Sequence, residues 1–210
     1  MHLAKKLFVG NLTNQPLIMV QTASTMLPLG TPLPSFELPF VSRKYCTDDS
    51  NQQERQFLNS KFFYQKPVLI MVLCAHCPFV KHIEQEIKKL EIDFEKYVDF
   101  VGVSSNSLKT HPQDGPDYLL QQATKLGWNF PYILDLEQTL AKSLKAACTP
   151  DFFLFGPSKE QQLLLKYRGQ FDHSRPGNNI SVTGNDLRLA IEALLSNRPV
   201  SQDQLPSIGC

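Results

Sequence analysis

The sequence predicts an α/β protein in which a central mixed β-sheet is flanked by helices. Two short apolar runs, 67–73 and 98–104, contain β-branched residues and end abruptly, as buried strands of a parallel sheet do. Each run is followed by a segment whose apolar residues recur at spacings of three and four, which indicates an amphipathic helix. Later, two strand-like segments flank the turn-forming sequence 156–160, which predicts an antiparallel hairpin. Parallel crossovers followed by a hairpin predict a mixed sheet.

The remaining elements follow from the same periodicities and from the positions of proline and glycine. Prolines recur between Leu27 and Pro39, which favours an extended lead-in, and residues 36–41 are expected to form a short edge strand. The polar stretch 42–66 is expected to be a surface hairpin or loop, and it contains Cys46. The other elements are predicted in the order strand 67–73, helix 78–97, strand 98–104, helix 114–127, strand 130–135, helix 137–147, strand 151–155, strand 163–167 and helix 185–196.

The composition is typical of a soluble globular enzyme. The chain has 210 residues, enough to bury a substantial core in one domain. Its 21 Lys and Arg residues balance 20 Asp and Glu residues, so no overall field attracts nucleic acid or an anionic membrane, and neither is an expected partner. Five cysteines are too few for a disulfide scaffold, and their odd number leaves at least one unpaired. This cysteine usage indicates a reducing compartment and hence a cytoplasmic protein.

The two ends of the chain are expected to lie outside the folded domain. Residues 1–36 contain no acidic residue, and residues 1–26 are predicted to be a flexible N-terminal extension. An organelle transit peptide is the alternative for this acid-poor leader, and the protein would then lie in a stroma or matrix. Residues 27–200 are predicted to form the domain, and residues 201–210 are predicted to form a C-terminal tail.

Two cysteines lie where the first buried strand is expected to pass into a helix. The free N–H groups and the positive dipole end of a helix N-terminus favour a thiolate, so Cys74 is the predicted nucleophile. Cys77 follows three residues later and is near enough to close a small disulfide ring. His76 lies between them and is expected to stabilise the thiolate as an imidazolium. A zinc half-site is the alternative, but no second ligand pair follows at zinc spacing, so neither a metal nor a cofactor is expected.

Three further residues each have two interpretations. Cys148 is either a small buried apolar residue or a third redox thiol. Cys210 is expected to be exposed, where it is either inert, which is the preferred interpretation, or a resolving partner. Arg168 either solvates a loop or places a guanidinium beside the thiolate, as a peroxidase requires.

Four segments of the chain carry a resemblance: CAHCPFVKH at 74–82, ACTPDFFLF at 147–155, RGQFDHSRPG at 168–177 and PSIGC at 206–210. Together they resemble the thioredoxin superfamily. More narrowly, the chain from about Met19 onward resembles its peroxiredoxin-like branch, which includes alkyl hydroperoxide reductase C and thiol-specific antioxidant proteins. The resemblance implies a thioredoxin-like fold. It also implies that Pro150 is cis and faces the two cysteines, and that the backbone of Thr149 pairs with a substrate.

The sequence departs from the best-known patterns of that superfamily at the site itself. Thioredoxins carry Trp before the first cysteine and Gly-Pro between the two, where this chain has Leu73 and Ala75-His76. Thioredoxins also bury an acid on the preceding strand, whereas the run 67–73 is wholly apolar. Typical peroxiredoxins carry Pro-x-x-x-Thr-x-x-Cys, and no Thr follows Pro67 at that spacing. Direct peroxide reduction is therefore not the preferred activity.

The leading functional hypothesis is a thiol–disulfide oxidoreductase that acts in cell redox homeostasis. Cys74 attacks a protein or low-molecular-weight disulfide, Cys77 resolves the mixed disulfide, and an external thioredoxin or glutathione system restores both thiols. The first alternative is a peroxiredoxin-like peroxidase, in which a cysteine is oxidised to a sulfenic acid. The second alternative is a non-enzymatic copper-binding assembly factor with a thioredoxin fold.

Overall fold

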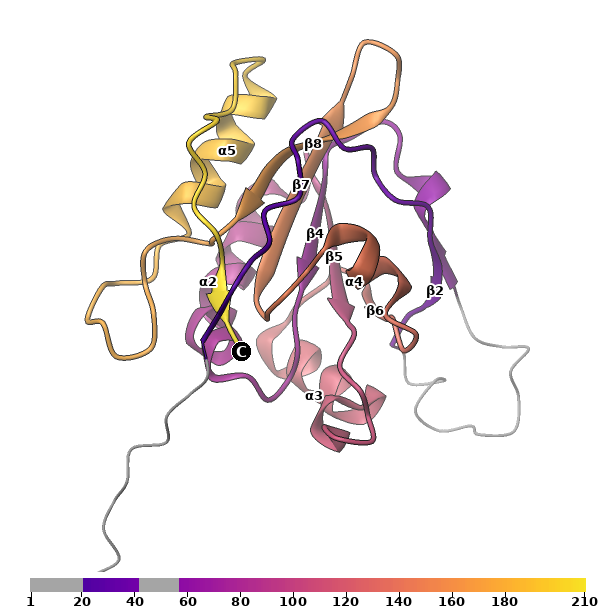
Figure 1. Ribbon diagram of the computed structural model, residues 1–210, viewed down its shortest axis with the longest axis vertical. Coiled ribbons are helices and arrows are strands. Elements are labelled where there is room, and N and C mark those ends of the chain that lie inside the picture. The colour runs from indigo at the N-terminus through magenta and orange to yellow at the C-terminus, as the bar shows by residue number, and fades with distance from the viewer. Residues whose placement is uncertain (1–20, 42–56) are drawn as a thin grey trace, which may run out of the picture.

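The central sheet has five strands and a mixed direction (Figure 1). A computed structural model describes residues 21–41 and 57–210, so Cys46 lies outside the described residues. The strands of the sheet are β4 (Val68–Val72), β5 (Asp99–Ser104), β6 (Tyr132–Leu134), β7 (Asp151–Pro157) and β8 (Leu163–Gly169). Their order is β6-β5-β4-β7-β8. The central strand β4 runs parallel to β5 and antiparallel to β7, as the predicted mixed sheet requires.

The predicted alternation of strands and helices is confirmed. The helices are α2 (Pro78–Phe94), α3 (Pro116–Leu126), α4 (Thr139–Leu144) and α5 (Asn185–Leu195). The helix predicted at 114–127 is shorter than expected because Asp114 closes a separate 3-10 turn, η3 (Pro112–Asp114). None of the helices in the described part of the chain has the length and apolarity needed to cross a membrane.

The strand β4 separates two apolar layers, because successive side chains of a strand point to opposite faces. Leu69 and Met71 pack with apolar residues of α2, α3 and α5. Ile70 and Val72 pack with apolar residues of α4 and of the lead-in segment 27–40. All five residues of β4 are buried. The strand that leads to the two cysteines is therefore fixed by contacts on both faces.

The lead-in segment forms a small sheet of its own. β2 (Glu37–Pro39) pairs antiparallel with β3 (Phe57–Asn59). β2 lies within the strand predicted at 36–41. The polar stretch predicted to be a hairpin or loop contributes β3 and the 3-10 turn η2 (Ser60–Phe62).

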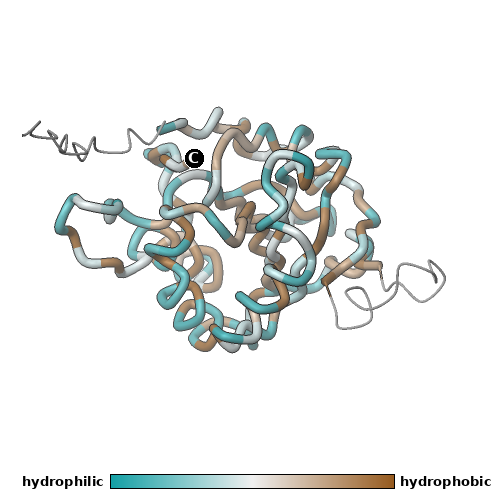
Figure 2. The backbone as a smooth tube through the Cα atoms, turned by 90° about the horizontal axis from the view of Figure 1, so that it is seen from below, coloured by the Kyte–Doolittle hydropathy of each residue, from teal (hydrophilic) through white to brown (hydrophobic). Residues whose placement is uncertain are grey.

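The first and last strands of the described chain pair with each other. β1 (Thr22–Ala23) is antiparallel to β9 (Ile208–Gly209). Figures 1 and 2 both show the mark of the C-terminus beside the point where the grey N-terminal trace joins the fold. This pairing differs from the predicted boundaries, which placed residues up to 26 and from 201 onward outside the domain. Neither segment has enough apolar residues to signal its burial in the sequence, and the strands are only two residues long.

Candidate active site

Cys77, rather than Cys74, occupies the N-terminal cap of α2. The helix begins at Pro78, because proline lacks the N–H group that would be unpaired in this first position. The cap residue Cys77 has an extended backbone, with φ −62° and ψ 126°. The strand pairing continues to Leu73, whose N–H donates to Val103 O, so Cys74 follows directly on the strand and is fully buried. Cys74 thus lies between β4 and α2, as predicted, but Cys77 is the residue that caps the helix.

Three thiols meet beside Thr149. The Cys77 sulfur lies 3.2 Å from the backbone oxygen of Thr149 and 3.2 Å from the sulfur of Cys210. The Cys74 sulfur lies 3.3 Å from the hydroxyl oxygen of Thr149. Cys74 and Cys77 are both fully buried, whereas Cys210 is exposed. The site thus presents one thiol to solvent and keeps two beneath it.

The buried thiols differ in acidity. The pKa of Cys77 is lowered to about 4, and the largest cause is a hydrogen bond from Cys74, which outweighs the opposing effect of burial. Hydrogen bonds from Thr149 and from the backbone N–H of Val80, in the first turn of α2, act in the same direction. The pKa of Cys74 is raised, first by the hydrogen bond to Cys77 and then by burial. Both shifts favour a thiolate on Cys77 over one on Cys74, whereas the sequence analysis predicted Cys74 as the nucleophile.

A buried carboxylate that the sequence analysis missed holds the turn before α2. Asp114 is fully buried, and its Oδ1 accepts hydrogen bonds from the backbone N–H groups of Ala75 (2.9 Å) and His76 (3.2 Å). Its Oδ2 accepts from Asn106 Nδ2 and pairs with His76 Nδ1, each at 2.7 Å. Four polar partners compensate the burial of this charge. The sequence placed Asp114 only at a helix start, and nothing local pointed to the distant turn that it contacts.

His76 is held by Asp114 and His111. Its backbone N–H and its Nδ1 both pair with Asp114, and its ring stacks on His111 with the centroids 4.9 Å apart. Within residues 21–41 and 57–210, no hydrogen bond joins His76 to Cys74 or Cys77. The predicted stabilisation of a thiolate by His76 would therefore act without a hydrogen bond to either sulfur, while the contacts of His76 with Asp114 fix the shape of the turn.

The same turn holds a group of possible metal ligands. The ligand atoms of Cys74, His76 and Asp114 lie within 4.8 Å of one another. Both Asp114 oxygens and His76 Nδ1 already take part in hydrogen bonds. A soft metal ion would suit the cysteine and the histidine, but it would have to replace part of this network.

The backbone of Thr149 pairs with residue 210 of the same chain. The Thr149–Pro150 bond is cis, as the resemblance implies. The Thr149 N–H donates to Cys210 O at 3.1 Å, and the Cys210 N–H donates to Thr149 O at 3.2 Å. A Cβ atom added to Gly209 would lie 2.0 Å from Thr149 O, so only glycine allows this approach. The groups expected to bind a substrate are thus occupied by the chain itself.

Two other candidates lie outside this cluster of contacts. Cys148 is 5% exposed, its sulfur lies 3.7 Å from Pro150 O, and burial raises its pKa. These observations support the first interpretation, a small buried apolar residue.

Arg168 donates from Nε to Leu27 O (2.9 Å) and from Nη1 to Gln204 Oε1 (2.7 Å). Among the described residues these side-chain hydrogen bonds reach no sulfur, so the structure does not support the interpretation that places the guanidinium beside the thiolate.

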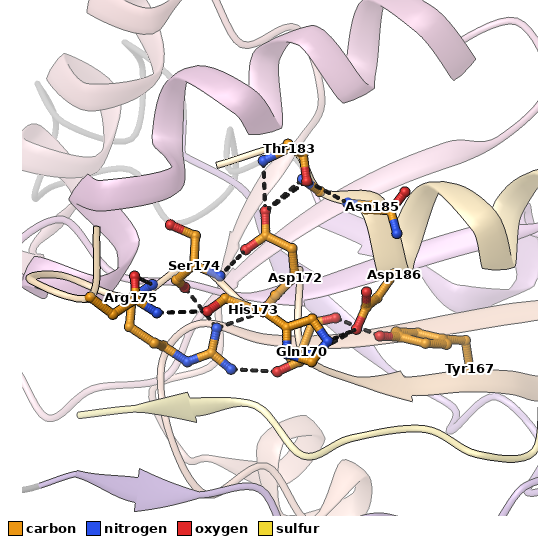
Figure 3. A network of polar contacts seen from close by, with 11 residues as sticks. Tyr167, Gln170, Asp172, His173, Ser174, Arg175, Thr183, Asn185 and Asp186 are labelled. Carbon is orange, nitrogen blue, oxygen red and sulfur yellow. Dashed lines mark hydrogen bonds and ion pairs between the residues drawn. The ribbon is translucent and has the colours of Figure 1, made fainter. Parts of the chain in front are cut away.

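A network of polar contacts shapes the loop after β8 (Figure 3). Asp172 is buried and accepts hydrogen bonds from the backbone N–H groups of Ser174, Thr183 and Gly184, each at 2.7 Å. Arg175 donates to the backbone oxygens of Asp172 and Ser174. The loop and β9 line the same small pocket next to the cysteine site. The network therefore gives the site a fixed border on that side.

Asp151 is a second buried carboxylate, and it lies under the paired ends of the chain. It is fully buried, and its Oδ2 accepts a hydrogen bond from Ser24 Oγ at 3.0 Å. Burial raises its pKa to about 7, although hydrogen bonds from Ser24 and Ser207 act in the opposite direction. Ser24 follows β1, so its hydrogen bond to Asp151 connects this short strand to β7.

Two features define a thioredoxin-like protein. One is the order of the strands in the sheet, and the other is a pair of cysteines between β4 and α2 that lies beside the cis bond before Pro150. Residues 29–162, more than half of the chain, match the model of the AhpC/TSA family. The chain belongs to this family, as the resemblance indicated.

Solved structures share this fold. An uncharacterized conserved protein from Geobacillus kaustophilus is 40% identical, with a TM-score of 0.80, and the match covers 91% of this chain and 95% of that chain. A hypothetical protein from Sinorhizobium meliloti 1021 is 34% identical, with a TM-score of 0.79, over 90% of this chain and 96% of that chain. A secreted disulfide oxidoreductase from Mycobacterium tuberculosis, described as homologous to E. coli DsbE, is 13% identical with a TM-score of 0.54, over 76% and 96%. This last likeness shows the fold alone. No curated protein matches the chain.

Proposed function

We propose that this protein is a thiol–disulfide oxidoreductase whose attacking group is the thiolate of Cys77. The observation that carries the proposal is the position of the Cys77 sulfur, at the cap of α2 and 3.2 Å from a second cysteine sulfur. A thiolate, not a thiol, attacks a disulfide, and a helix N-terminus favours the thiolate. Membership of the AhpC/TSA family supports a redox function and leaves the reaction open.

The proposed reaction has two exchange steps. The Cys77 sulfur attacks one sulfur of a substrate disulfide and displaces the other as a thiolate. A second thiol of the chain then attacks the mixed disulfide, which releases the second substrate thiol and leaves an intramolecular disulfide. Cys74 is the partner that the sequence suggests, with the order of the two residues reversed. An external thiol reductant of the thioredoxin or glutathione type returns both cysteines to thiols.

Asp114 supports this reaction from the buried side. Cys74 must lose its proton before it attacks, and burial and its bond to Cys77 raise its pKa. The Asp114 carboxylate lies within 4.8 Å of the Cys74 sulfur, which allows it to accept that proton through a small movement or a water molecule. It also fixes the turn at Ala75. The buried acid that β4 lacks is thus supplied by the turn before α3.

Peroxide reduction is a second candidate, favoured by the hydroxyl of Thr149. A peroxidatic thiolate uses a hydroxyl donor and a guanidinium to stabilise charge on the peroxide oxygens. Thr149 Oγ1 lies 3.3 Å from the Cys74 sulfur and supplies the first of these groups. The guanidinium of Arg168 is bound to Leu27 O and Gln204. We therefore expect disulfide reduction to exceed peroxide turnover.

Reduction of insulin and of glutathione disulfide, each coupled to a thiol reductant, tests the proposal. We expect Cys77→Ser to abolish both activities. Cys148→Ala is the matched control, because Cys148 is also a buried cysteine, but among the described residues its sulfur hydrogen-bonds to the backbone oxygen of Pro150 and to no other cysteine, and the variant should retain both activities. Consumption of hydrogen peroxide by the same proteins ranks the second candidate. Full activity in Cys77→Ser, or peroxide turnover faster than disulfide reduction, would overturn the proposal.

A further inference from the structure

We infer that Cys210 resolves the mixed disulfide on Cys77, and that residues 207–210, here called the docked segment, occupy the position of a substrate backbone on Thr149. The inference rests on the proposed attack by Cys77. It gives a role to a cysteine that the sequence analysis preferred to regard as inert. It also predicts which disulfides reach the site.

The sulfur atoms of Cys77 and Cys210 are already adjacent. They lie 3.2 Å apart, and a disulfide bond is about 2.05 Å long, so closure requires a movement of about 1 Å. The two hydrogen bonds between Cys210 and Thr149 hold the Cys210 backbone in place, while its side chain is exposed and able to turn. Cys74, by contrast, is fully buried. Of the two possible partners, Cys210 is the one that is both near and accessible.

The acidity of Cys210 depends on the state of Cys77. Burial, a hydrogen bond to Cys77 and the charge of Cys77 together raise the pKa of Cys210 to about 12. When Cys77 forms a mixed disulfide, it loses its negative charge, so two of these three causes disappear. Cys210 therefore ionises more readily once there is a mixed disulfide to attack.

The docked segment is built to lie against Thr149. Gly209 allows an approach that any Cβ atom would prevent, because that atom would lie 2.0 Å from Thr149 O. Ser207 Oγ donates to Gly169 O at 2.6 Å, and β9 pairs with β1. An extended peptide that pairs with Thr149 must displace this segment, whereas a small disulfide needs only the Cys210 side chain to turn aside. Low-molecular-weight disulfides are therefore the preferred substrates while the segment is docked.

The proposed steps balance in atoms and electrons. The Cys77 thiolate attacks a disulfide R–S–S–R, which yields Cys77–S–S–R and the thiolate RS⁻. The Cys210 thiolate then attacks the Cys77 sulfur, so the Cys77–S–R bond breaks, the Cys77–Cys210 bond forms and a second RS⁻ leaves. Each RS⁻ takes up a proton, including the one that Cys210 gave to solvent. The substrate gains two electrons, and the two cysteines lose two.

Disulfide mapping after oxidation by glutathione disulfide tests the inference. Free thiols are alkylated and the protein is digested with trypsin. Because Lys66 and Arg198 precede proline, Cys74 and Cys77 remain in peptide 62–81 and Cys210 remains in peptide 189–210. We expect these two peptides to be cross-linked in the wild type and in Cys74→Ser, and not in Cys77→Ser. A disulfide confined to peptide 62–81 in the wild type would overturn the inference and leave the proposed function standing.

Gly209→Ala separates docking from the presence of the thiol. It keeps Cys210 but removes the approach to Thr149, so the cross-link should form at least about tenfold more slowly. The ratio of insulin reduction to glutathione disulfide reduction should rise. Leu205→Ala is the matched control, since that exposed side chain precedes the docked segment, and it should behave as the wild type. Cross-linking at the wild-type rate in Gly209→Ala would overturn the docking argument. Loss of all exchange in Cys77→Ser alone would still confirm the proposed function.

Discussion

The Cys77 sulfur lies between two regions that hold it in different ways. On the inner side, Cys74 and Asp114 are fully buried, and the Asp114 carboxylate has four polar partners. On the outer side, the docked segment is held by two backbone hydrogen bonds to Thr149 and by a two-stranded sheet of two residues per strand. Small elements of this kind, held by few contacts, open at a lower free energy than a buried network does. The inner region therefore sets the acidity of Cys77, and the outer region governs access to it.

The largest expected effect comes from removing the inner thiol. Cys74→Ala should raise the pKa of Cys77 well above about 4, because the hydrogen bond from Cys74 is the largest cause of the shift. The rate of Cys77 alkylation as a function of pH, followed by mass spectrometry, measures this pKa. Cys148→Ala should leave the profile unchanged. An unchanged profile in Cys74→Ala would mean that the outer region and the helix cap determine the acidity instead.

The buried carboxylate of the inner region gives the next effect. Asp114→Ala leaves four part-buried N–H donors without this partner, so the free energy of unfolding should fall by about 2–4 kcal/mol. Urea unfolding of the reduced protein measures this change. Asp117→Ala is the control, because Asp117 is exposed in the first turn of α3, and its effect should stay within about 0.5 kcal/mol. Equal effects of the two substitutions would contradict the assigned role of Asp114.

The outer region rests on Asp151, whose pKa is raised from 3.8 to about 7. At pH values between 3.8 and about 7, Asp151 of the folded protein binds a proton that the unfolded chain has released. The free energy of unfolding therefore falls as the pH rises through 7. The contribution of Asp151 protonation to the free energy of unfolding is fully present below pH 3.8 and amounts to about 2–4 kcal/mol. Cys77 acts in the opposite direction, because its lowered pKa gives a contribution that is lost as pH falls through about 4. The difference between the wild type and Asp151→Asn, measured from pH 4 to pH 8, isolates the Asp151 contribution.

If the difference curve between the wild type and Asp151→Asn is flat, the buried carboxylate does not titrate in this range. The link from Asp151 to Ser24 and Ser207 would then contribute to the outer region only through uncharged hydrogen bonds.

The smallest effect is expected at Arg168. Its guanidinium bonds to Leu27 O and Gln204, so Arg168→Gln should change disulfide and peroxide turnover by less than about twofold. Steady-state rates of both reactions test this. A large and selective loss of peroxide turnover would restore the peroxidase candidate, because it would place the guanidinium at the reacting sulfur during turnover.

The sequence by itself determined the order of strands and helices and the place of the two cysteines between β4 and α2. Both follow from local patterns, since the spacing of apolar residues depends only on neighbours in the chain. The four segments that carry the resemblance also indicated the family and the cis bond before Pro150, which the structure contains. A local pattern predicts the helix or strand to which a residue belongs. It does not predict which distant residues that side chain will contact.

The tertiary structure decided which cysteine caps the helix and which groups surround its sulfur. The first residue of α2 lies directly after Cys77, so Cys77 and not Cys74 caps the helix. Asp114 and Cys210 reach the site only because strand pairing and the docked segment bring distant residues together. Arg168, which the sequence nominated, is bound elsewhere. Acidity and access depend on contacts between residues far apart in the chain, and no local spacing encodes them.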